Sequence, residues 1–172
     1  YCTLEATTDG STWTELWKSN YSNNTYASAD SSGYQVYTDV NVLIPEALQT
    51  SNVQFAFRYH KNAGGSGACS VDDVKLIATK ASSGGETDST LLDEKFDDFI
   101  TSGYSGSIPS DWTQAKKNSG IYTWRTYKTG DHITAYCTND LSSVRDSYGG
   151  GDEWGAGQDE YLITPALDLS GK

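Results

Sequence analysis

The strongest candidates for chemistry are four acidic residues that stand in two strand-like segments of the chain. Asp72 and Asp73 belong to one segment, and Glu94 and Asp97 belong to the other. If the two segments pair as neighbouring strands, the four carboxylates converge at one edge of a sheet. Carboxylates held close together repel one another, and Ca²⁺, which takes about six to eight oxygen ligands, relieves that repulsion. The four residues therefore predict a calcium site. The alternative is that they are solvated charges on an edge strand, where they prevent pairing with another strand.

A second acidic stretch, 146–160, carries its carboxylates among glycines. Its spacing does not match the calcium loop of an EF-hand. A solvated loop is therefore favoured over a second calcium site.

Aromatic residues in polar surroundings are the candidates for stacking against sugar rings, because they are large, rigid and polar at the tip. Trp154 and Tyr148 stand in the acidic glycine-rich stretch, and Trp124 follows another loop. We expect these three residues to contact a ligand, with Trp154 the most exposed. Most tryptophans of a β-sandwich lie in its core, and Trp13 and Trp112 are assigned there.

The sequence offers little support for catalysis. His60 and His132 are the only histidines, and they show neither metal-ligand spacing nor a nucleophile motif. No catalytic residue is therefore predicted. A fragment of a glycoside hydrolase is the alternative, and it would need two carboxylates roughly 5–10 Å apart in a cleft.

The net charge of −11 over 172 residues is spread along the chain. Proteins that bind nucleic acid concentrate Lys and Arg against the phosphates, so nucleic acid is excluded as a partner. No apolar run approaches the roughly 20 residues that a membrane span needs.

Three cysteines, Cys2, Cys69 and Cys137, leave at least one thiol unpaired, and their spacing fits no zinc motif. If the strands of Cys2 and Cys69 are neighbours, these two residues form a disulfide. Otherwise each cysteine is a small buried hydrophobic residue.

Short alternating segments separated by Gly, Asn, Asp and Ser indicate an all-β sandwich, and almost nothing is typical of helix. A turn at Asp9-Gly10 predicts a hairpin, and 45–49 predicts one short helical turn. The expected strands are 1–7, 13–17, 34–44, 52–60, 69–78, 91–96, 112–115, 122–127, 133–138 and 161–164.

Four parts of the chain together resemble the choice-of-anchor J and cleaved-adhesin family of secreted bacterial proteins. They are LLDEKFDD (91–98) with IPSDWT (108–113), DEYLITPALDL (159–169), LEATTDGSTW (4–13), and VQFAFRY (53–59) with VDDV (71–74). The resemblance implies a jelly-roll fold, an extracellular or cell-surface location, and structural calcium.

The order of these parts is reversed relative to the family. Residues 1–78 correspond to the second half of a jelly-roll module, 79–90 form a polar linker, and 91–172 correspond to a first half. The family has one central strand between these two halves. In this chain that strand would have to stand between Lys172 and Tyr1, and no segment supplies it. The order fits a circularly permuted domain, a cut across two tandem modules, or a domain-swapped homodimer.

These observations predict a non-catalytic extracellular module that binds a glycan or a surface protein, as an accessory part of a larger secreted protein. A structural spacer domain is the further alternative.

Overall fold

The computed structural model describes residues 1–19, 38–62, 68–82, 85–99, 105–116, 123–129, 132–138 and 158–171. Every strand pair in this part of the chain is antiparallel, so the expected all-β class is confirmed. The described residues also hold two short 3₁₀ turns, η2 (Glu46–Leu48) and η3 (Asp97–Phe99), and the first lies in the expected helical turn. The strands are β1 (Cys2–Thr7), β2 (Thr14–Lys18), β3 (Gln54–Lys61), β4 (Ala68–Val71), β5 (Val74–Ser82), β6 (Gly85–Glu94), β7 (Ser105–Gly106), β8 (Thr113–Lys116), β9 (Arg125–Thr129), β10 (His132–Thr138) and β11 (Gln158–Ile163).

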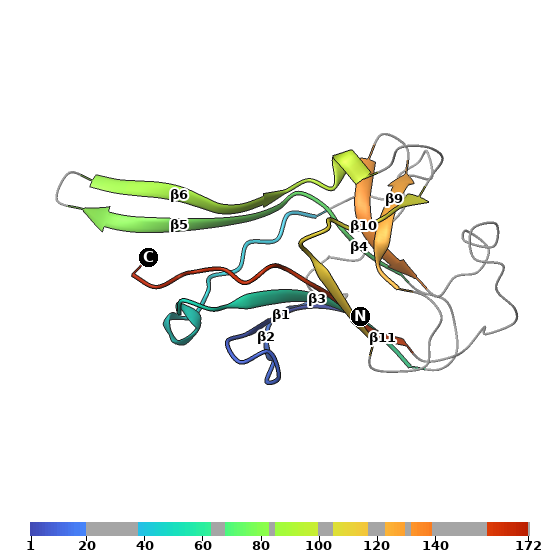
Figure 1. Cartoon of the computed structure of the whole chain (residues 1–172), viewed down its shortest axis with the longest axis horizontal. Coiled ribbons are helices and arrows are strands. Elements are labelled where there is room, and N and C mark those ends of the chain that lie inside the picture. The colour runs from blue at the N-terminus through green and yellow to red at the C-terminus, as the bar shows by residue number, and fades with distance from the viewer. Residues whose placement is uncertain are drawn as a thin grey trace, which may run out of the picture.

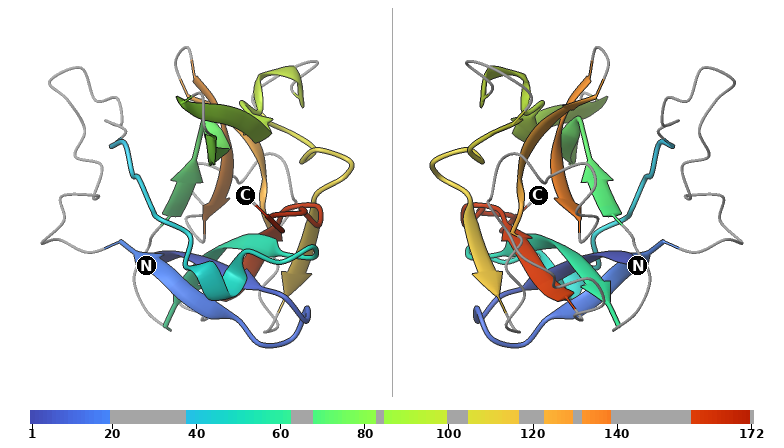
Figure 2. Two further views of the ribbon diagram at one scale, coloured as in Figure 1. Left: turned by 90° about the vertical axis from the view of Figure 1, so that its left-hand side faces the viewer. Right: turned by 90° about the vertical axis from the view of Figure 1, so that its right-hand side faces the viewer.

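The strands form a sandwich of two layers (Figures 1 and 2). One layer is a five-stranded sheet with the order β2-β1-β3-β11-β8. The other layer holds a four-stranded sheet, β4-β10-β9-β7, and the two-stranded β5-β6 sheet. Strands from both ends of the chain lie side by side, because β3 pairs with β1 on one side and with β11 on the other.

The main hydrophobic core lies between the five-stranded and four-stranded sheets. Tyr59 and Leu162 come from the first sheet, and Ala135 comes from the second. Trp112 is 3% exposed and packs edge-on against Phe96, as expected for a core tryptophan. Burial of aromatic side chains of this size is the main source of stability in a sandwich.

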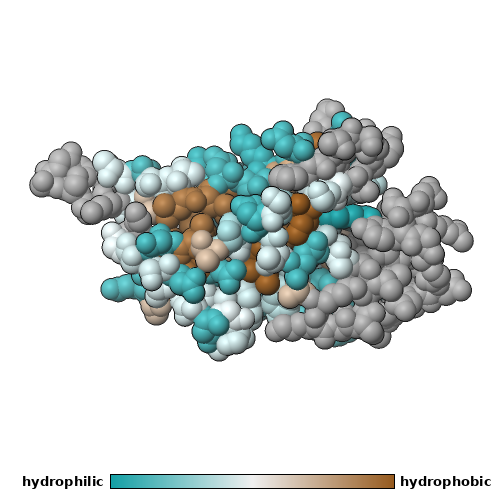
Figure 3. Space-filling model, in the orientation of Figure 1, coloured by the Kyte–Doolittle hydropathy of each residue, from teal (hydrophilic) through white to brown (hydrophobic). Residues whose placement is uncertain are grey.

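A second core lies between the five-stranded sheet and the β5-β6 hairpin. Ala6 and Phe55 are buried there, and Leu76 of β5 and Leu91 of β6 pack against them while partly exposed. Figure 3 shows hydrophobic side chains at the surface between this hairpin and the five-stranded layer. This second core is therefore less completely covered than the first.

The expectation of a polar linker over 79–90 is wrong for most of its length. Residues 79–82 belong to β5 and 85–90 to β6, and the two strands pair from Val74↔Glu94 to Ser82↔Gly85. The hairpin extends beyond the rest of its layer (Figure 1). Residues 87–90 of β6 are exposed, so polar side chains there face water and an apolar face is not needed.

The predicted strand over 34–44 is also wrong where the structure describes it. Residues 38–45 belong to no strand, and Leu43 is 95% exposed. An alternating pattern specifies which face a strand would bury, but it does not supply a neighbour to pair with. Residues 34–37 lie outside the described part of the chain.

The structure joins Cys2 to Cys69 in a disulfide with a Cα–Cα distance of 5.8 Å. The bond links β1 in one layer to β4 in the other. Cys137 keeps its thiol, is buried, and lies directly opposite Cys69 on the neighbouring strand. Cys69 and Cys137 belong to the main core, and the partly buried Cys2 packs against it.

No helix in the described segments is long and apolar enough to cross a membrane.

Candidate functional site

The outer face of the five-stranded sheet, which points away from both cores, carries a group of polar and aromatic side chains. Side chains alternate between the two faces of a strand. Leu4 and Phe57 pack toward the cores, so the residues that follow them, Glu5 and Arg58, point to the outer face. Tyr161 precedes the core residue Leu162 and reaches the outer face in the same way.

Arg58 joins three neighbouring strands on this face. Its Nε and Nη2 donate hydrogen bonds to the two carboxylate oxygens of Asp159 on β11, at 2.5 and 2.9 Å. Its Nη1 donates to Oε1 of Glu5 on β1, at 3.1 Å. The two bonds to Asp159 form a bidentate guanidinium–carboxylate pair, which adds geometric specificity to the interaction.

This charged group is largely screened from water. The side chains of Arg58, Glu5 and Asp159 are 23%, 5% and 17% exposed. Burial alone would raise the pKa of Asp159, but the hydrogen bonds and positive charge of Arg58 outweigh it and hold that pKa below its usual value. The hydrogen bonds to Asp159 in turn raise the pKa of Arg58. Arg58 and Asp159 therefore stay charged near neutral pH.

Tyr161 lies beside this ion pair. Burial, followed by the negative charge of Glu5, raises the pKa of Tyr161 to about 12. Its phenol therefore stays neutral at neutral pH and keeps its proton as a hydrogen-bond donor. The guanidinium of Arg58 lies 5.1 Å from the centre of the Tyr161 ring.

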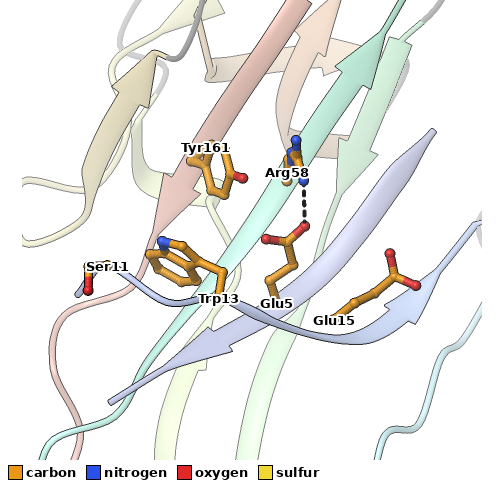
Figure 4. Close-up of a pocket in the computed structure, with 6 residues that line it drawn as sticks. All are labelled: Glu5, Ser11, Trp13, Glu15, Arg58 and Tyr161. Carbon is orange, nitrogen blue, oxygen red and sulfur yellow. Dashed lines mark hydrogen bonds and ion pairs between the residues drawn. The ribbon is translucent and has the colours of Figure 1, made fainter. Parts of the chain in front are cut away.

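A shallow pocket of about 360 Å³ opens on this face. Figure 4 shows its residues: Trp13 and Glu15 come from the β1–β2 turn and β2, and they stand on either side of Glu5. The full lining is Glu5, Ser11, Trp13, Glu15, Arg58 and Tyr161. An aromatic wall therefore faces a row of charged and hydrogen-bonding groups.

The turn between β1 and β2 positions Trp13. Asp9 Oδ1 accepts hydrogen bonds from the backbone N–H groups of Ser11 and Thr12, at 2.8 and 2.7 Å. These backbone bonds hold the pKa of Asp9 well below its usual value. Gly10 has a φ of +72°, a conformation that glycine adopts without steric cost. The Trp13 ring then lies 5.7 Å from that of Tyr161, measured between centroids, and stays partly exposed.

Glu15 is the exposed carboxylate of the pocket. It lies directly opposite Glu5 across the β1–β2 pair. Lys18, the cation of the same strand, holds its ammonium 3.8 Å from the centre of the Tyr1 ring. Like charges on opposed strand positions are unfavourable, so this arrangement is one that a positively charged ligand would relieve.

The predicted calcium ligands are brought together only in part. The strands that carry them do pair, with Val74 opposite Glu94. However, Asp72 Oδ1 accepts the backbone N–H of Asp73, and Glu94 Oε1 accepts that of Phe96, at 3.0 and 2.6 Å. Within the described ranges, no three acidic, histidine or cysteine side chains gather closely enough to hold a metal.

Asp72 and Asp73 instead lie where the predicted strand over 69–78 is interrupted. Asp73 has a φ of +49°, which aspartate tolerates better than most residues, and it separates β4 from β5. The predicted strand over 69–78 is therefore two strands. The calcium site of Asp72, Asp73, Glu94 and Asp97 stays a prediction.

That prediction has a direct test in thermal unfolding. If these acids bind calcium after their side chains turn, calcium at a hundredfold excess over its Kd stabilises the protein by about 2.7 kcal/mol. The measurement is the melting temperature with 2 mM calcium and with EDTA, for the wild-type protein and for Glu94→Gln. Equal melting temperatures in calcium and EDTA, with no metal by elemental analysis, would exclude the site.

The predicted ligand-binding aromatic residues have mixed outcomes. Trp124 is 1% exposed and donates its indole N–H to the backbone carbonyl of Glu160 at 3.1 Å. Its assignment to a ligand site is therefore wrong, because its ring is packed in the main core. Trp154 and Tyr148 lie outside the described residues.

The outer-face pocket was not predicted from the sequence. Trp13 was expected in the core, whereas it lines the pocket and is partly exposed. The available signal was the alternation in 2–7 and 54–61, which puts Glu5 and Arg58 on the outer face of their strands. What alternation could not show is that Asp159 and Tyr161 lie on the strand next to Arg58.

No protein-family model, curated protein or solved structure matches this chain. The resemblance to the choice-of-anchor J family therefore stays a prediction.

Proposed function

We propose that this chain is a non-catalytic carbohydrate-binding module that acts in adhesion outside the cell, as an accessory part of a larger secreted protein. The observation that carries the proposal is the Trp13 ring, partly exposed beside Tyr161 at the wall of an open pocket lined by charged groups. Aromatic faces stack on the apolar faces of sugar rings, and nearby charged groups hydrogen-bond the hydroxyls.

The pocket is built on a preorganised surface. The Arg58 side chain is fixed by one hydrogen bond that it donates to Glu5 and two that it donates to Asp159. A rigid site loses little entropy on binding, which suits a module that contacts only one or two sugar rings. Because such contacts are few, we expect affinities between about 1 µM and 1 mM.

The disulfide supports the extracellular location. Disulfides form and persist in oxidising environments and are rare in the cytosol. The Cys2–Cys69 bond crosses from one layer of the sandwich to the other, where it would strengthen a module exposed to proteases and variable conditions.

Trp13→Ala tests the proposed function. We expect it to weaken glycan binding at least about tenfold, the effect of removing a central aromatic contact. Binding is measured by calorimetry and on a glycan array, with far-UV circular dichroism to show that the fold is kept. Leu43→Ala is the matched control, because it removes an exposed apolar side chain outside the pocket.

Two outcomes would contradict the proposal. Equal binding by the wild-type protein and Trp13→Ala would place the glycan elsewhere. Hydrolysis of a chromogenic glycoside that is lost in Glu5→Gln or Glu15→Gln would favour the glycoside hydrolase, since these two carboxylates occupy opposed positions in the pocket.

A further inference from the structure

The charge of the outer-face pocket indicates which glycans it binds. Glu5 and Glu15 line it, Asp159 lies next to it, and Arg58 is the one cation among its described lining residues. Two of the three carboxylates already bind Arg58. Three carboxylates around one guanidinium leave these four groups with a net negative charge, and Glu15 carries the exposed part of it.

Glu15 is available to a ligand. It is exposed, and it forms no hydrogen bond or ion pair within the described part of the chain. Lys18 on the same strand is placed over the Tyr1 ring. A cation that enters the pocket would meet the Glu15 carboxylate with Glu5 beside it.

Trp13 adds a second attraction for a cation. The face of an indole ring is the best aromatic partner for an ammonium group, and the same face stacks on a pyranose ring. A ligand that carries a positive charge on a sugar ring would use both properties of Trp13 while its ammonium donates hydrogen bonds to Glu15.

We propose that the pocket selects glycans with free amino groups, as in oligomers of glucosamine, over neutral and acidic glycans. This inference rests on the proposed function and specifies its ligand class. Acidic sugars are disfavoured, because their carboxylates would approach Glu15 and a chain whose net charge is −11.

The test compares three hexasaccharides by calorimetry at pH 6: glucosamine, its N-acetylated counterpart, and galacturonate. Acetylation removes the positive charge and keeps the ring backbone. We expect the glucosamine hexamer to bind the wild-type protein up to about fivefold more tightly than the acetylated one, as for an exposed charge pair. Its affinity should fall between 50 and 500 mM NaCl, because salt screens exposed charges.

Glu15→Gln is the decisive variant, because it removes the charge and keeps the shape. It should reduce the affinity for the glucosamine hexamer about fivefold and leave the acetylated hexamer unchanged. Glu46→Gln is the matched control, since Glu46 is exposed in η2 and lies outside the pocket. It should change neither affinity.

The outcomes separate this inference from the proposed function. Equal binding of the two hexamers, with both lost in Trp13→Ala, would overturn the amino-sugar preference and keep glycan binding. Binding of neither hexamer nor any array glycan would overturn both. A lysine hexapeptide that binds as tightly as the glucosamine hexamer would also overturn the inference, because recognition would then need no sugar ring.

Discussion

Replacing Cys2 and Cys69 together by alanine is expected to lower the free energy of unfolding by about 4 kcal/mol. The disulfide closes a loop between residues 67 apart in the sequence, and a loop of that size restricts the unfolded chain by roughly this amount. For a chain of this length the loss corresponds to a fall of about 10 °C in melting temperature. Differential scanning calorimetry measures both quantities.

The double variant is needed because of Cys137. In Cys2→Ala alone, the thiol of Cys69 would face that of Cys137, which lies directly opposite on β10. These two thiols could then form a substitute disulfide and conceal the loss. The control is Cys137→Ala, which removes one buried thiol and should cost about 1 kcal/mol.

A melting temperature of the double variant within about 2 °C of the wild-type value would show that the cross-layer bond contributes little. Non-reducing mass spectrometry of the wild-type protein checks the connectivity, and a Cys69–Cys137 peptide would contradict the pairing described here.

Most of the strands could be predicted from the sequence because their patterns are local. Alternation located β1, β2 and β3, and Asp9-Gly10 marked the turn that joins β1 to β2. The turn chemistry is intrinsic to its residues, since Gly10 and the short side chain of Asp9 favour it in any context.

The errors in the fold concern pairing partners. The segment 38–45 has strand-like alternation and belongs to no strand, whereas 79–90 is polar and forms most of a hairpin. Strand formation depends on a neighbour as much as on the strand's own residues, and one sequence does not show which segments become neighbours.

The candidate site was missed for the same reason. Glu5, Arg58 and Asp159 are far apart in the sequence, and only the β1–β3–β11 register brings them together. A shift of one residue in either pair would turn one of these side chains toward the core. Trp124 illustrates the converse error, because a polar sequence neighbourhood does not prevent burial.

Replacing Arg58 by methionine is expected to have the second-largest effect, a loss of about 2–3 kcal/mol of stability. Methionine keeps much of the side-chain volume but leaves the largely buried Glu5 and Asp159 without their shared cation. Removal of one partner from a buried ion pair costs about 3–5 kcal/mol, and the partial exposure of Arg58 reduces this value. Lys75→Met is the control, because its pair with Asp93 is about half exposed and should contribute less than about 1 kcal/mol.

The loss in Arg58→Met should depend on pH in a defined direction. Arg58 holds the pKa of Asp159 below its usual value of 3.8. The stability that this shift contributes is fully present above the usual value and disappears as the pH falls through the lower, folded-state pKa. The difference in unfolding free energy between the wild-type protein and Arg58→Met should therefore be constant from pH 5 to 7 and shrink below about pH 4. Urea unfolding across this range measures it, and a difference that stays constant down to pH 2 would show that Arg58 stabilises the sheet through packing rather than through its charge.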